Sequence, residues 1–160
     1  PDKTFTFKST NSQSWRDTSG WRTDNNYVYQ GEWSGGGNHR GLWFFNSADI
    51  RAKLAGLTIK RVRISVTRLS KGGSSSAQKP TFWLHSYTSP PSGTPLLAAS
   101  FTPSTSFAWG DPAKWVTLPN NYGDDLKNNL RQGIALYNSN RAPYMLFSGS
   151  ATLEIVAGSA

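Results

Sequence analysis

The stretch TIKRVRISV, residues 58 to 66, decides the fold class. Val62 and Ile64 fall on one side of an extended chain, and Arg61 and Arg63 fall on the other. This alternation is typical of a strand in a sheet that packs one face on a core and leaves the other in water. The stretch therefore predicts a β protein with a solvated, basic outer surface.

Shorter runs on both sides of this stretch predict further strands, because they alternate or are apolar throughout. The runs are KTFTFKS (3–9), NYVYQGEW (26–33), HRGLWFFN (39–46), TFWLHSYTS (81–89), KWVTLP (114–119), IALYN (134–138), PYMLFS (143–148) and ATLEIVA (151–157). Segments such as SGGGN (34–38) and PPSGTP (90–95) lie between them and predict loops.

Two segments are typical of short helices. In SADIRAKLAG (47–56), Ser47 is the expected N-cap and Gly56 the expected end. In GDDLKNNLRQG (123–133), the acids come early and Gly133 is the expected stop.

Seven to nine short strands with two helical insertions predict an all-β, jelly-roll-like β-sandwich with one or two short helices. At this length, residues 1–160 are expected to form a single domain. Because the chain starts at Pro1 without Met, we expect a domain excised from a larger protein. No run approaches the roughly 18 apolar residues of a spanning helix, so no membrane insertion is expected.

The composition predicts aromatic rings at the surface. The chain has seven tryptophans and 13% aromatic residues, but only 36% hydrophobic residues in total. Rings must therefore fill much of the core, and a surplus is expected outside it. Trp43, within an apolar run, is expected in the core, whereas Trp33, beside the glycine loop, is expected to be exposed.

The formal net charge of +8 indicates an anionic counter-surface such as a glycan, a cell wall or nucleic acid. The basic residues are scattered, however. The densest set, Lys60, Arg61, Arg63 and Arg68, is interpreted as a solvated sheet face.

The sequence predicts no enzyme. A glycosidase needs two carboxylates that face each other across a cleft. Among nine acidic residues, Asp49, Asp124 and Asp125 are expected near helix starts, and Glu154 is expected on an exposed strand face. No nucleophile elbow or phosphate-binding loop is present either.

The sequence also predicts no metal and no cofactor. Cysteine is absent, and His39 and His85, the only histidines, are not spaced as a metal pair. His39 is interpreted either as a donor to a ligand or as a residue that stabilises a turn. His85 is expected to pack between the rings of Trp83 and Tyr87.

A carbohydrate site needs exposed rings beside planar polar groups, because sugars stack their C–H faces on rings and donate and accept hydrogen bonds through their hydroxyls. Residues 11 to 43 supply this mixture. The candidate ligand-binding residues are Trp15, Arg16, Trp21, Arg22, Tyr29, Trp33, His39 and Arg40.

The repeated pair in SWRDTSGWRTDN (14–25) has a structural interpretation as well. Each tryptophan would close one rim of the sandwich, with its arginine stacked above the ring and paired to the following aspartate, Asp17 or Asp24. For this motif, both a structural role at the rim of the sandwich and a role in ligand contact stay open.

Two phrases resemble the DNRLRE-type β-sandwich family. One runs from YQGEW to RISVTRL (29–69), with Phe45-Asn46 at the family's Phe-Asp position, and the other is WVTLPNNYGDDLKNNLRQGIALY (115–137). The phrases SWR (14–16), GWRTDN (20–25), VYQGE, GNHRGLWFF and APYMLF are similar to modules of minor tail or tail-fibre proteins of phages and prophages. The resemblance implies a non-catalytic, carbohydrate-binding-module-like sandwich, but it assigns no ligand residue.

We therefore expect an adhesion module that recognises a cell-surface or cell-wall polysaccharide at an extracellular or virion surface, such as a phage tail receptor-binding domain. Repetition on a homotrimer would raise its avidity. The alternative is a structural virion or surface domain without a ligand. A single-stranded nucleic-acid binder is less expected, because rings and basic residues do not interleave along one strand pair.

Overall fold

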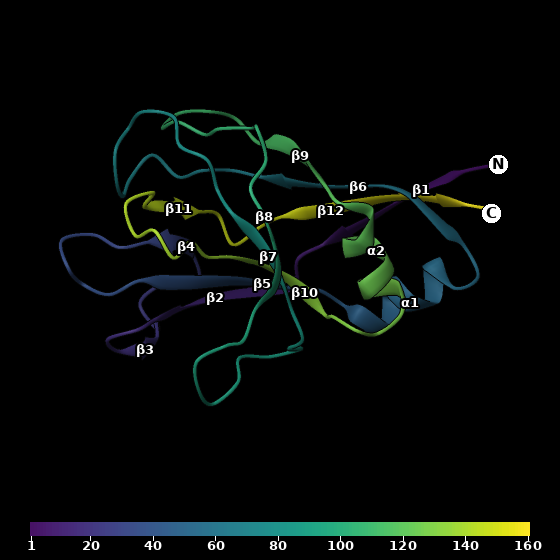
Figure 1. Ribbon diagram of the computed structural model, residues 1–160, viewed down its shortest axis with the longest axis horizontal. Helices are drawn as coiled ribbons and strands as arrows, with labels where there is room; N and C mark the ends of the chain where they lie inside the picture. Colours follow the sequence, from purple (N-terminus) through teal and green to yellow (C-terminus); the bar gives the residue numbers. More distant parts are fainter.

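The computed structural model describes residues 1–160 as two antiparallel β-sheets with two short helices (Figure 1). The four-stranded sheet has the order β1 (Lys3–Lys8), β12 (Thr152–Gly158), β6 (Thr58–Val66), β9 (Lys114–Leu118). The larger sheet has the order β11 (Met145–Phe147), β4 (Val28–Gly31), β5 (His39–Phe44), β10 (Gly133–Leu136), β7 (Phe82–His85), β8 (Ala98–Phe101). In addition, β2 (Asn11–Arg16) pairs with β5 and with β3 (Gly20–Trp21).

The chain crosses repeatedly between the two sheets. Strands β1, β6, β9 and β12 belong to the four-stranded sheet, and every connection between them passes through the larger one. The order β1-β12-β6-β9 therefore accompanies the order β5-β10-β7-β8, which is the arrangement of a jelly roll. The predicted fold class is confirmed, although twelve strand segments form where seven to nine were expected.

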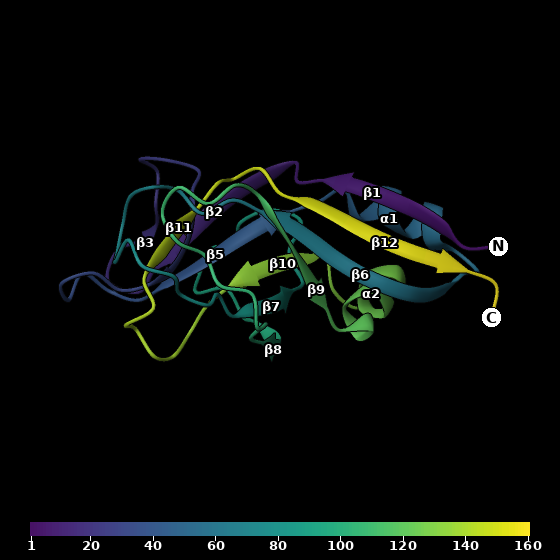
Figure 2. The same cartoon turned by 90° about the horizontal axis from the view of Figure 1, so that it is seen from above.

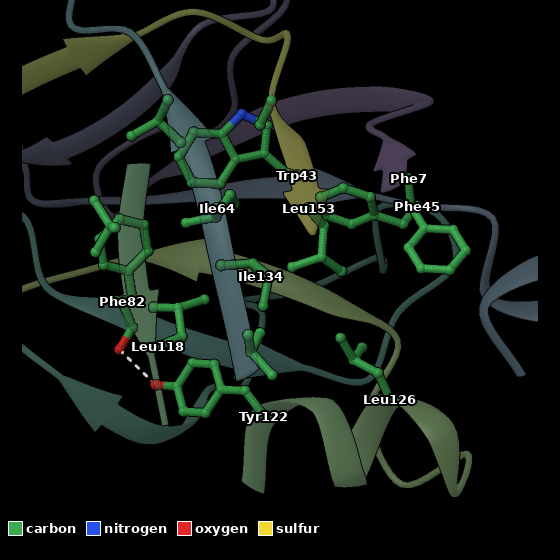
Figure 3. Packing of buried hydrophobic residues seen from close by; sticks show 14 of the residues in the cluster. Phe7, Trp43, Phe45, Ile64, Phe82, Leu118, Tyr122, Leu126, Ile134 and Leu153 are labelled. Carbon is green, nitrogen blue, oxygen red and sulfur yellow. Dashed lines mark hydrogen bonds between the residues drawn. The ribbon is translucent and has the colours of Figure 1, made fainter. Parts of the chain in front are cut away.

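The core lies between the sheets, as the alternation in residues 58 to 66 predicts. Val62 and Ile64 are completely buried, and so is Trp43 of β5, as expected. Figure 3 shows Trp43 and Phe82 in this core with Tyr122, whose hydroxyl donates a hydrogen bond of 3.0 Å to the Phe82 carbonyl. One buried cluster thus joins both sheets and the second helix.

Helix α1 (Ser47–Leu54) forms where it was predicted, but its cap is different. Asn46 is the N-cap, and its side-chain oxygen accepts a hydrogen bond of 3.1 Å from the Asp49 amide. Ser47 instead donates to the Gln132 carbonyl. The predicted capping role of Ser47 is therefore wrong, because asparagine, an equally good cap, stands one residue earlier.

Helix α2 (Asn120–Lys127) begins three residues earlier than predicted and ends well before Gly133, which instead opens β10. The helix follows directly after its N-cap Pro119, so Asn120 and Asn121 belong to its first turn. Gly123 lies against the sheet, where a Cβ atom would come within 2.8 Å of Val62 and 2.9 Å of Ile59. Asp124 and Asp125 therefore lie in the middle of the helix rather than at its start.

The basic outer face of β6 surrounds Glu154, which was predicted to be exposed but is buried. Glu154 of β12 is only 8% exposed, and its carboxylate accepts hydrogen bonds from Arg61 (3.0 Å) and Arg63 (2.7 Å). Arg63 also stacks on Trp115, with 4.2 Å between its Cζ atom and the ring centre. Cross-strand partners thus cover a side chain that strand alternation alone places in water.

The two ends of the molecule differ. Both termini and both helices lie towards one end, and the β4–β5, β6–β7, β8–β9 and β10–β11 connections lie towards the other (Figures 1 and 2). None of the helices has the length and apolar character needed to cross a membrane.

Candidate ligand-binding site

Four connections meet at the loop end of the sandwich, and three of them contribute rings. They line an open hollow of about 300 Å³, here called the indole hollow, whose lining is Trp33, Gly72, Gly73, Trp109 and Tyr144. Trp33 comes from the β4–β5 connection and Trp109 from the β8–β9 connection. Tyr144 comes from the β10–β11 connection, so the hollow exists only in the folded chain.

The indoles of this hollow face solvent. Trp33 is 61% exposed and Trp109 is 40% exposed. The Trp33 ring is stacked near Tyr144, with 5.9 Å between ring centres and 30° between ring planes. The prediction that Trp33 is exposed is confirmed, but Trp109 and Tyr144 were missed, because nothing near them in sequence indicates that they meet Trp33.

Arg68 fixes the β6–β7 connection, which contributes Gly72 and Gly73 to the hollow. The sequence placed this arginine on the solvated face, yet it is 1% exposed and donates to the carbonyls of Gly72, Ser74, Ser76 and Phe107. Burial lowers the pKa of its guanidinium from the usual value, and Asp111 opposes this shift. Arg68 therefore sets the loop's shape, which corrects its assignment as a surface cation.

Glycine is required in the loop that Arg68 holds. Gly73 has φ of +74°, and a Cβ atom there would collide with the Tyr144 carbonyl oxygen. Only glycine allows this backbone to approach Tyr144 so closely.

Tyr29, His39 and Arg22 form a stack beside the indole hollow. The Tyr29 and His39 rings lie 4.6 Å apart and nearly parallel, and the Arg22 Cζ atom lies 4.3 Å from the centre of the Tyr29 ring. Tyr144 lies 6.3 Å from Tyr29, centre to centre, and so connects this stack to Trp33.

The contacts of His39 fix its tautomer. Arg22 Nη1 lies 3.1 Å from Nε2 of His39, and because a guanidinium only donates, Nε2 must accept. The Nδ1–H group then donates to the Gly31 carbonyl at 2.7 Å. Burial lowers the pKa of His39 to about 4, with a smaller contribution from Arg22, so this neutral form persists at neutral pH.

A second, polar hollow of about 310 Å³ lies on the Arg22 side of the stack. We call it the arginine hollow, and its lining residues are Arg16, Ser19, Trp21, Arg22, Thr23 and Asp24. Arg22 and Asp24 form an ion pair of 2.8 Å, which lowers the pKa of the Asp24 carboxyl. The two hollows are linked by Tyr29 and Tyr144.

The remaining predicted residues lie elsewhere. Trp15 packs edge-on against Trp21, and the Trp21 indole donates to the Pro91 carbonyl at 2.7 Å. Arg40 stacks on Tyr137, with 4.3 Å between its Cζ atom and the ring centre. Neither Trp15 nor Arg40 lines a hollow, so the structure does not bring all the predicted residues into one site.

The repeated Trp-Arg motif is only partly as expected. The predicted Arg22–Asp24 ion pair forms, but Arg22 stacks on Tyr29 instead of a tryptophan. Arg16 makes no ion pair with Asp17; its Nε atom donates to Ser19 at 2.9 Å. The two halves of the motif therefore differ, since only the second half lies over a tyrosine.

The second histidine is buried among rings, as predicted, but Phe44 takes the place expected for Trp83, whose ring packs on Tyr137. His85 is completely buried, stacks on Tyr87 and packs edge-on against Phe44. Burial lowers its pKa to about 4. No group of three or more His, Cys, Asp or Glu residues is placed to hold a metal ion.

No known family model matches this chain, and no curated protein matches it. The resemblance to DNRLRE-type sandwiches and phage tail modules therefore stays a prediction.

Proposed function

We propose that the protein is a non-catalytic module that binds a polysaccharide of a cell surface or cell wall at its loop end. One observation carries the proposal. Three tryptophans are strongly exposed, Trp33, Trp109 and Trp115, and two of them line the same hollow. Exposed large rings that gather in one hollow from separate loops are typical of ligand sites, whereas single exposed rings are ordinary surface.

The chemistry of the surface around the hollow suits a sugar chain. The faces of Trp33 and Trp109 offer apolar area for the C–H faces of sugar rings. The neighbouring arginine hollow offers guanidinium and hydroxyl donors from Arg16, Ser19 and Thr23 for sugar oxygens. An extended chain would contact both hollows across Tyr29 and Tyr144.

The position of the hollow suits display. The connections that line it lie at the loop end, away from both termini (Figures 1 and 2), so a domain joined to a parent protein through either terminus would keep it free. We place the module at an extracellular or virion surface, for example in a phage tail receptor-binding protein. Single sites of this kind bind weakly, and three copies in a homotrimer would raise avidity.

The test is an array of immobilised polysaccharides probed with wild type, Trp33→Ala, Trp109→Ala and Trp115→Ala. Trp115 is the matched control, because it is as exposed as Trp109 but lies on β9, outside the hollow. Each hollow variant is expected to lose at least about fivefold in affinity, since stacking contributes on the order of 1 kcal/mol or more per ring, and the control is expected to bind like wild type.

Three outcomes would contradict the proposal. Equal losses in all three variants would indicate nonspecific adhesion by exposed rings. Binding to no polysaccharide, with Trp33 and Trp109 buried between subunits of a trimer, would favour a structural surface domain. Binding to single-stranded DNA that falls steeply with salt would favour nucleic acid instead.

A further inference from the structure

We propose that the polysaccharide is acidic and that the Arg16 guanidinium binds its anionic group, a carboxylate or a phosphate. This inference depends on the proposed function, because it assigns the chemical class of the ligand of that same surface. It concerns the arginine hollow, whereas the proposed function depends on the indole hollow.

Arg16 is the uncommitted arginine of the arginine hollow. Its Nε atom donates to Ser19 Oγ at 2.9 Å, and its two terminal nitrogens make no hydrogen bond within the protein. Arg22 in the same hollow differs, because both Nε and Nη2 donate to Asp24, at 3.2 and 2.8 Å. The only carboxylate lining the hollow is thus already paired, and Arg16 has none.

The free donors of Arg16 match an anionic group. A guanidinium presents parallel N–H groups in a planar fork that fits carboxylate and phosphate oxygens in a bidentate manner. The hydroxyls of Ser19 and Thr23 line the same hollow and add donors. The donors in this hollow thus outnumber its free acceptors, which favours an anion over a neutral hydroxyl.

Arg16 is tied to the loop that carries Trp33. Thr18, two residues after Arg16, donates through its hydroxyl to the Gly36 carbonyl at 2.6 Å. The Gly36 amide in turn donates to the Trp33 carbonyl at 3.1 Å. When one sugar unit stacks at the indole hollow, the next units of the polysaccharide therefore come within reach of Arg16.

The charge of the whole chain agrees with an acidic ligand. Three acids lie close in sequence to the arginine hollow. Asp24 pairs with Arg22 and Glu32 pairs with Arg141, whereas Asp17 makes no ion pair. The net charge of +8 then acts on a polyanion at long range and speeds its approach.

Calorimetric titration with three probes tests the inference: polygalacturonate, the same polymer after full methyl esterification, and poly(glycerol phosphate). Wild type is compared with Arg16→Gln, Arg16→Lys, Arg131→Gln and Trp33→Ala. Arg131 is the control, because it loses the same charge but lies beyond α2, where its side chain bonds Ser86. Thermal unfolding of each variant checks that the fold is kept.

We expect wild type to bind polygalacturonate or poly(glycerol phosphate) at least about tenfold more tightly than the esterified polymer. The stronger of the two acidic probes identifies carboxylate or phosphate. Arg16→Gln is expected to lose this preference, Arg16→Lys to keep part of it without the bidentate fork, and Arg131→Gln to keep all of it.

The failures are distinguishable. Equal affinity of wild type for the acidic and esterified polymers, with loss of both in Trp33→Ala, would overturn the inference and leave the proposed function standing. An unchanged preference in Arg16→Gln, or an equal loss in Arg131→Gln, would also overturn it. Binding to none of these probes and to no polysaccharide on the array would overturn both.

Discussion

Arg68 and His39 are the residues whose environments the sequence describes least well. Arg68 was assigned to the solvated face together with its basic neighbours. Alternation continued past Val66 places it instead on the inner side, and its side chain donates to four buried or part-buried carbonyls. His85 was predicted correctly to lie among rings, but only Tyr87 of its two expected partners contacts it, because Phe44 of a neighbouring strand supplies the other ring. For His39 both interpretations stayed open, because its partner Arg22 lies on another part of the chain.

Replacing Arg68 with methionine should destabilise the protein by about 3 kcal/mol or more, because four carbonyls would lose a charged donor in a buried site. Urea unfolding measures this difference. Arg61→Met, in which an exposed arginine leaves Glu154 still bonded to Arg63, is the control and should cost less than about 1 kcal/mol. Equal losses of stability in the two variants would contradict the role of Arg68 in setting the shape of the β6–β7 loop.

Stability should fall as the pH is lowered from about 6.5 to about 4. In the folded protein the pKa of both His39 and His85 is lowered from 6.5 to about 4, so in this window the unfolded chain binds protons that the folded chain does not. Each shift corresponds to at most about 3 kcal/mol.

Urea unfolding at pH 7 and pH 4.5 measures this loss. Replacing His85 with asparagine should make the protein less stable at pH 7 but should reduce the loss between the two pH values. A pH dependence as steep in that variant as in wild type would contradict the assignment of the loss to buried histidines.

At the scale of elements, the sequence predicts strands with strong apolar periodicity and misses those held by polar contacts. Strand β2 was missed because it is rich in Ser, Asn and Gln, yet Ser12 and Ser14 are buried and donate to the carbonyls of Asn26 and Tyr27. Such partners lie outside the local window, so no periodicity shows them.

Gly123→Ala should destabilise the protein by about 1–3 kcal/mol, although alanine favours helices over glycine by about 1 kcal/mol. The added Cβ atom would crowd Val62 and Ile59 of β6. Thermal unfolding of Gly123→Ala beside Asn121→Ala, at an exposed position of the same helix, measures the effect. A raised melting temperature in Gly123→Ala would contradict the close packing of α2 on the sheet.

At the scale of the whole molecule, the jelly roll decides which predicted residues meet. The sequence identified Trp33 through its glycine-rich neighbours, but it had no signal for Trp109 or Tyr144, which reach the hollow from later loops. The topology also separates Trp15 and Arg40 from the hollows. Composition correctly predicted a surplus of rings, and only the fold shows where the surplus gathers.

The most direct test of the central claim follows the indole N–H signals of all seven tryptophans by NMR while the best polysaccharide from the array is added. We predict that the signals of Trp33 and Trp109 shift with a common affinity, while those of buried Trp43 and of Trp115 on β9 stay in place. Shifts confined to Trp115, or to Trp15 and Trp21, would contradict a ligand site in the indole hollow.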